Sequence, residues 1–235
     1  MKLLICTQAV DRRDPILGFF HRWLVEFAAH CDEILVLCLR AGDFDLPPHV
    51  TVVELGATRA ARARGVVRES FARRKHYDAV FIHMNPEYIL AAGWLWRLLH
   101  KPVVLWYTHK AVSWRLRLAL PFTTRILTAS AESFRLPTNK TLVMGHGIDT
   151  ERAVPKRTPR SGAVRLLTSS RISRVKGLEV LIDAYLALKA RGARVSLRII
   201  GAPVTEKDEV YARTLRERLR AAGEDLEAIL SGATP

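Results

Sequence analysis

The sequence has few cysteines and no long apolar run, and both absences narrow the class of protein. Its three cysteines, Cys6, Cys31 and Cys38, form no CxxC pair, which excludes a disulfide scaffold and a thiolate zinc site and fits a reduced compartment. The longest apolar run, residues 89–99, is interrupted by Arg97 and is far shorter than the roughly 20 residues that cross a bilayer. The start, MKLLICTQAVDRRD, reaches charged residues too soon for a secretory signal. We therefore expect a cytoplasmic protein without a membrane span.

What the sequence has in excess is positive charge. Its 235 residues carry 37 Lys and Arg against 23 Asp and Glu, a formal net charge of +14, while 49% hydrophobic residues indicate a globular chain. The excess is spread over both halves and is dense in residues 59–75, where Glu69 is the only acid, and in residues 152–176, which have none. Such runs are either solvated faces or surfaces for polyanions: phosphorylated small molecules, nucleic acid, or an anionic membrane.

Short β-branched runs alternate with longer segments of helical length. The runs are mostly continuously apolar, which is typical of parallel strands buried on both faces, and Pro15 and Pro86 suit the first turn of a helix. The strands are expected at residues 3–7, 33–39, 50–55, 79–83, 102–107 and 125–129, and the helices at 15–30, 58–76, 86–100 and 111–120. The alternation predicts an α/β fold with a doubly wound parallel sheet.

A polar, basic, proline-containing stretch at residues 150–162 interrupts this alternation and indicates a linker. The pattern then restarts, with strands expected at 164–169, 195–201 and 226–230 and helices at 175–191 and 207–222. A doubly wound domain usually has about five or six strands, so the second unit is expected to be incomplete. The predicted organisation is a first domain at residues 1–150, a linker at 151–162, and the first part of a second domain at 163–235.

Two loops of the first domain carry candidate binding residues. The loop that ends at Gly18 joins the first strand to the first helix, whose N-terminus favours an anion. The sequence has no GxGxxG, which argues against a dinucleotide oxidoreductase, and Gly18 alone could equally be a turn or packing glycine. After a later strand, His109 and Lys110 could meet a sugar hydroxyl and a phosphate, or His109 could be a core histidine bonded to backbone. Gly145 and Gly147 suit a domain crossover, since they permit backbone conformations closed to other residues.

The second domain carries the clearest signal for a ligand. In SSRISRVKG, Arg171 ends a strand and Lys176 stands five residues later at the start of a helix. Cations at a helix N-terminus oppose the helix dipole, so they cost stability unless an anion binds there. A diphosphate is the natural ligand, because Arg offers a forked contact and Lys a point charge. The next strand ends in a glycine turn at Gly201, which is consistent with a wall of a nucleotide pocket.

These residues resemble a known enzyme family. The run RISRVKGLEVLIDAYLAL followed by LRIIGAP resembles the start of the donor domain of glycosyltransferase family 4, retaining enzymes built from two Rossmann-like domains in the GT-B architecture. GHGID resembles the crossover motif of that family, with His146 where Asn is usual. The segments TQAVDRRDPILGFFHRWL, HMNPEY, LWYTHK and TASAESFRL are similar to a bacterial subgroup. The resemblance covers the whole chain and implies a cytoplasmic role in making cell-envelope polysaccharide.

The resemblance implies roles for particular residues. Arg171 and Lys176 would bind the diphosphate of a nucleotide-sugar and stabilise the leaving group, with Gly18 against the same phosphates. His109 would face the donor sugar and Gly201 would border the nucleotide. The family also implies retention of anomeric configuration and no required metal or other cofactor, because cations neutralise the diphosphate.

One departure bears on activity. The family has a later acidic motif, two Glu separated by seven residues after Pro-Ser, which grips the ribose and the donor sugar, and the sequence ends at Pro235 without it. The expectation is that residues 1–235 alone are inactive, and a catalytically silent half-domain stays open as an alternative.

The resemblance implies that the first domain holds the acceptor, a lipid-linked or polysaccharide precursor. Candidate contacts are His83, Asn85 and Glu87, although a helix cap explains Asn85 to Glu87 equally well. Residues 111–122 (AVSWRLRLALPF) have a composition that can lie on the inner face of an anionic membrane, or form an ordinary helix packed on the sheet. A basic nucleic-acid-binding α/β protein is the main rival, but no helix-turn-helix, zinc module or aromatic sheet face is readable, so we expect no nucleic-acid partner.

Overall fold

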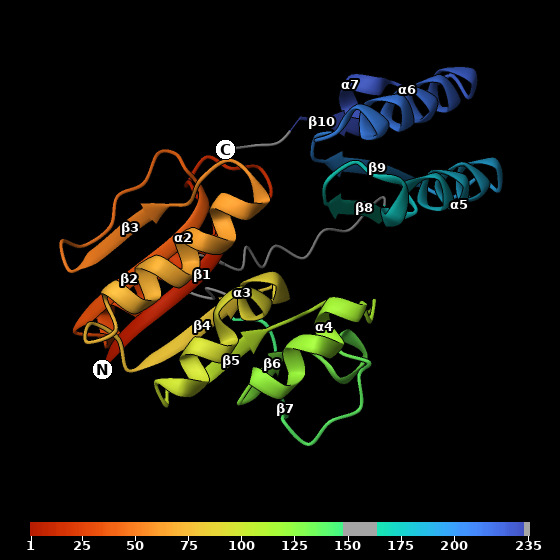
Figure 1. Ribbon diagram of the computed structural model, residues 1–235. Coiled ribbons are helices and arrows are strands. Elements are labelled where there is room, and N and C mark those ends of the chain that lie inside the picture. Colours follow the sequence, from red (N-terminus) through yellow and green to blue (C-terminus); the bar gives the residue numbers. More distant parts are fainter. Residues whose placement is uncertain (148–163, 233–235) are drawn as a thin grey trace. The chain divides into compact units, whose positions relative to one another are not determined.

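The computed structural model describes residues 1–147 and 164–232 (Figure 1). The chain forms two compact units, Met1–Thr150 and Glu151–Pro235, each with its own sheet. The predicted linker, and the Ile148 and Asp149 of the glycine motif, lie outside the described residues. The roles assigned to the two units, acceptor domain and donor domain, stay predictions.

The first unit is a seven-stranded parallel sheet in the order β3-β2-β1-β4-β5-β6-β7. Its strands are β1 (Lys2–Val10), β2 (Glu33–Ala41), β3 (Val50–Glu54), β4 (Ala79–His83), β5 (Val103–Trp106), β6 (Arg125–Thr128) and β7 (Thr141–Val143). The predicted α/β fold and its first six strands are confirmed. The strand β7 was not predicted, because a run of three residues carries no readable period.

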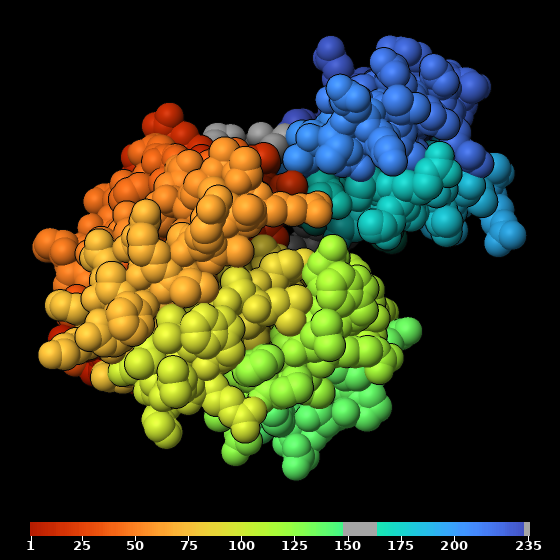
Figure 2. Space-filling view, viewed as in Figure 1, coloured from red at the N-terminus to blue at the C-terminus, as the bar shows by residue number. Residues whose placement is uncertain are grey.

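Helices cover both faces of this sheet, as the continuously apolar strands require. On β1, Leu4 and Cys6 belong to one buried cluster while Leu3 and Ile5 belong to the other, since alternate side chains point to opposite faces. The helix α1 (Gly18–His30) covers the second cluster. The helices α2 (Arg59–Ala72), α3 (Pro86–Leu98) and α4 (Trp114–Ala119) cover the first cluster, and η1 (Leu120–Phe122) continues α4. Figure 2 shows the layer of α2, α3 and α4 facing the viewer.

The helix α1 begins at Gly18, so the predicted start at Pro15 was wrong. The Asp14 carboxylate accepts hydrogen bonds from the amides of Ile16 and Leu17, at 2.8 and 2.7 Å, and these bonds hold a turn ahead of the helix. Pro86, in contrast, is the first residue of α3, as predicted.

The second unit is a three-stranded parallel sheet in the order β10-β9-β8. Its elements are β8 (Val164–Ser169), η3 (Arg174–Lys176), α5 (Leu178–Ala190), β9 (Val195–Ile200), α6 (Glu206–Ala221), α7 (Leu226–Ile229) and β10 (Leu230–Ser231). The expected strand at residues 226–230 was largely wrong, because the Asp225 carboxylate accepts from the amides of Glu227 and Ala228 and starts the short helix α7.

Both long helices of the second unit pack on one face of its sheet. The buried cluster joins Ile182 of α5 and Leu215 of α6 to Leu197 and Ile199 of β9. On β8, Leu167 is 66% exposed, so the other face of the sheet has no helix over it in the part of the chain that the structure describes.

Candidate functional site

The loop between β8 and α5 contains both cations that the sequence analysis singled out. Arg171 and Lys176 are both exposed, and together with Arg174 they give this loop three positive charges. Gly177 caps α5 with φ of 61°, a left-handed conformation that suits glycine. The loop follows the carboxyl end of a parallel strand, which is where ligands bind in open α/β sheets.

A close backbone contact holds this loop against the turn that follows β9. The amide of Ser170 donates to the carbonyl of Ile200 at 3.0 Å, and the amide of Ile172 donates to the carbonyl of Ala202 at 3.0 Å. A side-chain carbon at Gly201 would lie only 1.9 Å from the Ser170 carbonyl oxygen, and Gly201 has φ of 150°. Glycine is therefore required at this position by packing alone, so its presence does not by itself indicate a bound nucleotide.

Arg171 has an acidic neighbour that the sequence analysis did not name. Its Nε lies 3.9 Å from Oδ2 of Asp208, and its side chain is still 39% exposed. Asp208 also accepts from the Thr205 amide while Thr205 accepts from the Asp208 amide, so a capping box fixes the carboxylate at the start of α6. The S/T-x-x-D/E spacing of Thr205 and Asp208 could have identified the cap, but only the fold brings it next to Arg171.

A second set of contacts fixes the start of α5. The Tyr211 hydroxyl donates to the Glu179 carboxylate, and the Arg174 guanidinium lies 5.5 Å from the centre of the Tyr211 ring. Ser173 is 3% exposed, and its hydroxyl has no hydrogen-bond partner in the described residues. Arg174 thus lies against the Tyr211 ring, while Arg171 stays 39% exposed beside Asp208 and Lys176 is exposed.

In the first unit, His83 ends β4 but is not open to solvent. It is 2% exposed, and its ring stacks on Phe20 with 4.1 Å between ring centres. The Thr7 hydroxyl lies 3.2 Å from its Nδ1. Burial lowers the pKa of His83 to about 4, so the ring is neutral near pH 7. This position favours a packing role over contact with an acceptor.

His109 follows β5 and is exposed, in contrast to His83. Its Nδ1 accepts from the Ala111 amide at 3.0 Å, and the Tyr107 hydroxyl donates to the Ala111 carbonyl at 3.0 Å. Because Nδ1 is an acceptor, the proton of the neutral ring is on Nε2, and that N–H is the group a ligand would meet. The alternative of a core histidine is excluded by its exposure.

The loop that ends at Gly18 already contains an anion of its own. The Asp14 carboxylate pairs with Arg40 and takes two amide hydrogen bonds, and the Gly18 amide donates to the Asp14 carbonyl at 3.0 Å. Burial raises the pKa of Asp14, but the amide donors and Arg40 outweigh it and hold the pKa below its ordinary value. A side-chain carbon at Gly18 would lie 3.0 Å from the Arg12 carbonyl oxygen, so close packing also accounts for this glycine.

Asn85 and Glu87 lie together at the start of α3. Asn85 occupies the N-cap position, but its side chain makes no capping bond and its Oδ1 instead accepts from Gln8 Nε2 at 2.9 Å. Glu87 Oε1 lies 3.6 Å from Nε of Arg115. Both residues line a pocket of about 430 Å³ between α2, α3 and the end of β1. Side-chain capping therefore does not explain Asn85.

The described residues contain no group of three or more His, Cys, Asp or Glu placed to hold a metal ion, and all three cysteines are buried. Gly145 has φ of 74°, so the first glycine of the GHG motif is required by its backbone conformation. The His146 ring lies 6.1 Å from the Trp106 ring.

No family model matches the sequence, and no curated protein matches it. Solved structures do match. HepE of Anabaena, in complex with UDP, is 17% identical with a TM-score of 0.72, and the match covers 100% of this chain and 70% of HepE. The fold is of the GT-B type.

Other matches support the same fold. WaaG, a glycosyltransferase involved in lipopolysaccharide biosynthesis, is 13% identical with a TM-score of 0.59, and the match covers 99% of this chain and 70% of WaaG. The UDP-GlcNAc 2-epimerase of Methanocaldococcus jannaschii is 13% identical with a TM-score of 0.54, and the match covers 100% and 74% of the two chains. At these identities the likeness defines the fold and leaves the reaction open.

Proposed function

We propose that this protein is a glycosyltransferase that takes a sugar from a nucleotide-diphosphate-sugar and passes it to an acceptor held by the first unit. The observation that carries the proposal is the pair of exposed cations, Arg171 and Lys176, in a loop that backbone contacts hold at the carboxyl edge of the second sheet. The HepE structures in complex with UDP and with UDP-glucose support a donor of this class.

Each candidate residue has a role in this proposal. Arg171 would make a forked contact with the diphosphate and Lys176 a point-charge contact, and both would stabilise the leaving nucleotide without a metal. Asp208 would orient Arg171. In the first unit, His109 would donate from Nε2 to the donor sugar, and the backbone at Gly18 would border the phosphates. Membership of family 4 and retention of configuration belong to the same proposal.

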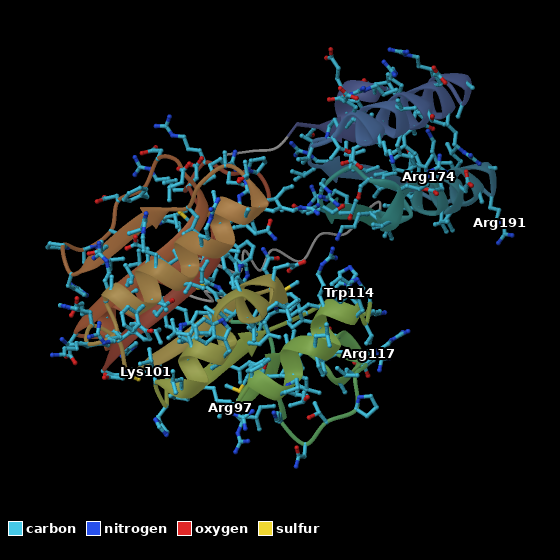
Figure 3. All side chains as sticks on the ribbon, in the orientation of Figure 1. Arg97, Lys101, Trp114, Arg117, Arg174 and Arg191 are labelled. Carbon is cyan, nitrogen blue, oxygen red and sulfur yellow. The ribbon has the colours of Figure 1, made fainter. Side chains whose placement is uncertain are left out.

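Binding of UDP and UDP-glucose by the full chain tests the proposal. The double variant Arg171→Gln/Lys176→Gln should bind UDP at least about 100-fold more weakly by calorimetry, since charged hydrogen bonds contribute about 1.5–3 kcal/mol each, or about 3–6 kcal/mol for the two. Arg191→Gln/Arg194→Gln is the matched control, because it removes the same charge from the segment that follows the C-terminal end of α5, where Figure 3 shows Arg191. Equal UDP affinity of the two variants would refute the assignment.

The epimerases among the structural neighbours define the alternative reaction. Incubation with UDP-GlcNAc and no acceptor separates the two, because an epimerase changes the sugar while a glycosyltransferase leaves it intact. Formation of the 2-epimer at a steady rate would replace the proposed reaction with epimerisation.

The proposal includes peripheral contact with an anionic membrane through the layer of α2, α3 and α4. Trp114 is 60% exposed and Leu118 55% on α4, and Leu98 is 68% exposed on α3. Figure 3 shows Trp114 and Arg117 on α4 and Arg97 at the end of α3. Exposed aromatic and aliphatic side chains among arginines are typical of an interfacial surface. No helix among the described residues is long and apolar enough to span a bilayer.

A further inference from the structure

The pocket of about 430 Å³ in the first unit combines a cationic rim with an apolar floor. Its floor is formed by Leu39, Val66 and Tyr88. Its polar lining consists of Gln8, Arg59, Arg62, Asn85, Glu87 and Arg115. The volume is in the usual range for small-ligand sites, about 300–1,000 Å³.

The charges around this pocket are not balanced. Three arginines against one glutamate leave a net charge of +2 on the lining. Glu87 already lies 3.6 Å from Arg115, so it offsets one arginine and leaves Arg59 and Arg62. These two residues are in the first turn of α2, which contains no acid and where the helix dipole disfavours cations. An anion in the pocket would relieve both the mutual repulsion and the unfavourable dipole interaction.

The arginines are partly held in place before any ligand binds. Arg62 donates from Nε to the Gly56 carbonyl at 3.1 Å, which leaves its two terminal nitrogens for another acceptor. Arg115 is held by Glu87 from α3 and by the Trp114 ring, 4.9 Å from its guanidinium carbon. Guanidinium groups fixed in this way lose less conformational entropy when they bind an anion, and their forked geometry matches phosphate oxygens.

The remaining wall supplies neutral hydrogen-bonding groups. Gln8 Nε2 donates to Asn85 Oδ1 at 2.9 Å. That bond uses the oxygen of Asn85, so its NH₂ group is the part that can donate to a ligand. A single phosphate would satisfy the cations and the amide together, whereas a neutral sugar would leave the net charge of +2 uncompensated.

We propose that this pocket binds a phosphate or diphosphate group of the acceptor, in contact with Arg59, Arg62 and Arg115. The identification of the bound group with the acceptor rests on the proposed function, while the binding of the anion does not. The pocket is lined by residues of the first unit, whereas Arg171 and Lys176 belong to the second unit. In this proposal Asn85 and Glu87 line the acceptor site, and the acceptor is an anion.

The probe is inorganic pyrophosphate, titrated by calorimetry into the full chain carrying Arg171→Gln/Lys176→Gln, so that the proposed donor site does not contribute. Adding Arg59→Gln/Arg115→Gln should weaken pyrophosphate binding about 100-fold, at about tenfold for each lost charge-assisted contact. The matched control is Arg64→Gln/Arg117→Gln, which removes the same charge from the same two helices outside the pocket. Equal weakening in both pairs would overturn the proposal, because it would show a general charge effect.

Folding is checked by the unfolding temperature and by the conservative pair Arg59→Lys/Arg115→Lys. This pair keeps the charge and should recover part of the lost affinity. No recovery in a folded protein would also count against the pocket as a phosphate site. UDP binding by the chain with Arg171 and Lys176 intact should be unchanged by Arg59→Gln/Arg115→Gln, so failure of this site and failure of the proposed donor site give different results.

The source of the phosphate is decided on the chain carrying Arg171→Gln/Lys176→Gln, so that pyrophosphate binding again reports the pocket and not the proposed donor site. Vesicles of phosphatidic acid and phosphatidylcholine are bound first, and pyrophosphate is added at constant ionic strength. Release of the protein by pyrophosphate, but not by an equal charge of chloride, assigns the pocket to a lipid headgroup. Retention on the vesicles while pyrophosphate binds assigns it to a soluble anion.

Discussion

Gly201 and Ser170 are in contact through their backbones, so closely that no side chain fits between them. A side-chain carbon at Gly201 would lie 1.9 Å from the Ser170 carbonyl oxygen. This contact joins the turn after β9 to the loop that carries Arg171, and hydrogen bonds on both sides of it keep the two segments in register. The conformation of the candidate diphosphate loop therefore depends on a glycine that lies outside it.

Gly201→Ala should destabilise the second unit. The backbone at φ of 150° is strained for any L side chain, at about 1–3 kcal/mol, and the clash with Ser170 adds to that cost. We expect a loss of about 3 kcal/mol or more in the free energy of unfolding of the second unit, measured by denaturant titration or native-state hydrogen exchange.

Gly192→Ala is the control for this prediction, because it has the strained backbone conformation without the steric clash. Gly192 has φ of 78° but no atom within 4 Å of an added side-chain carbon, so it should cost only about 1–2 kcal/mol. If Gly201→Ala costs no more than Gly192→Ala, the contact with Ser170 does not constrain the loop.

His83 should make the first unit less stable in acid. Its pKa is about 4 when folded and about 6.5 when unfolded, so between these values the unfolded chain binds the extra proton. The contribution is fully present above about pH 6.5 and is lost as the pH falls to about 4, in total about 3 kcal/mol at 1.36 kcal/mol per pH unit. Wild-type protein should therefore lose about 3 kcal/mol more than His83→Gln between pH 7 and pH 4, measured by denaturant unfolding.

Wild type and His83→Gln share the same carboxylates. The difference between their two curves of unfolding free energy against pH therefore removes the carboxylate titrations. Parallel curves for wild type and His83→Gln would contradict a buried neutral imidazole.

Vesicles containing phosphatidylglycerol should bind the protein, and vesicles of phosphatidylcholine alone should not. Trp114→Ala/Arg117→Gln should weaken this binding about 30-fold, since an interfacial arginine contributes about 1 kcal/mol and partial burial of a tryptophan a similar amount. The measurement is co-sedimentation at low salt, and at 1 M salt binding should fall sharply because the screening length drops to about 3 Å.

The control for the vesicle experiment is Val180→Ala/Arg191→Gln, which removes an exposed apolar side chain from α5 and a cation from the C-cap of the same helix in the second unit. This pair should bind vesicles like wild type. Equal binding to neutral and anionic vesicles at low salt would refute membrane contact through α3 and α4.

Much of the candidate site could be predicted from the sequence, but not which residues are accessible. His83 and His109 both follow parallel strands and look equivalent in the sequence. The fold buries one beneath Phe20 and leaves the other exposed, because α1 crosses the end of β4 and no helix crosses His109 in the described residues. Similarly, the positions of Gly201 and Gly18 in the sequence were interpreted as ligand-binding. In the structure each glycine packs so closely against neighbouring backbone that packing alone accounts for it.

Short-range chemistry also explains where predicted boundaries were wrong. Asp14 and Asp225 accept backbone amides two or three residues ahead. Asp14 thereby holds a turn where a helix was expected from Pro15, and Asp225 starts α7 where a strand was expected. These side-chain bonds compete with regular secondary structure over a few residues, which is below the length at which an apolar period can be read.

The sequence by itself determined the α/β class, the order of the first six strands along the chain, and the cations after β8. Continuous apolar runs and helical spacing are local properties, so they can be read without the fold. Only the tertiary structure decided that Arg171 lies beside Asp208, and that arginines from α2 and α4 line one pocket with Asn85 and Glu87. Those relationships join residues far apart in the chain, and they exist only because parallel strands bring their carboxyl ends, and the helices that follow them, to the same edge of a sheet.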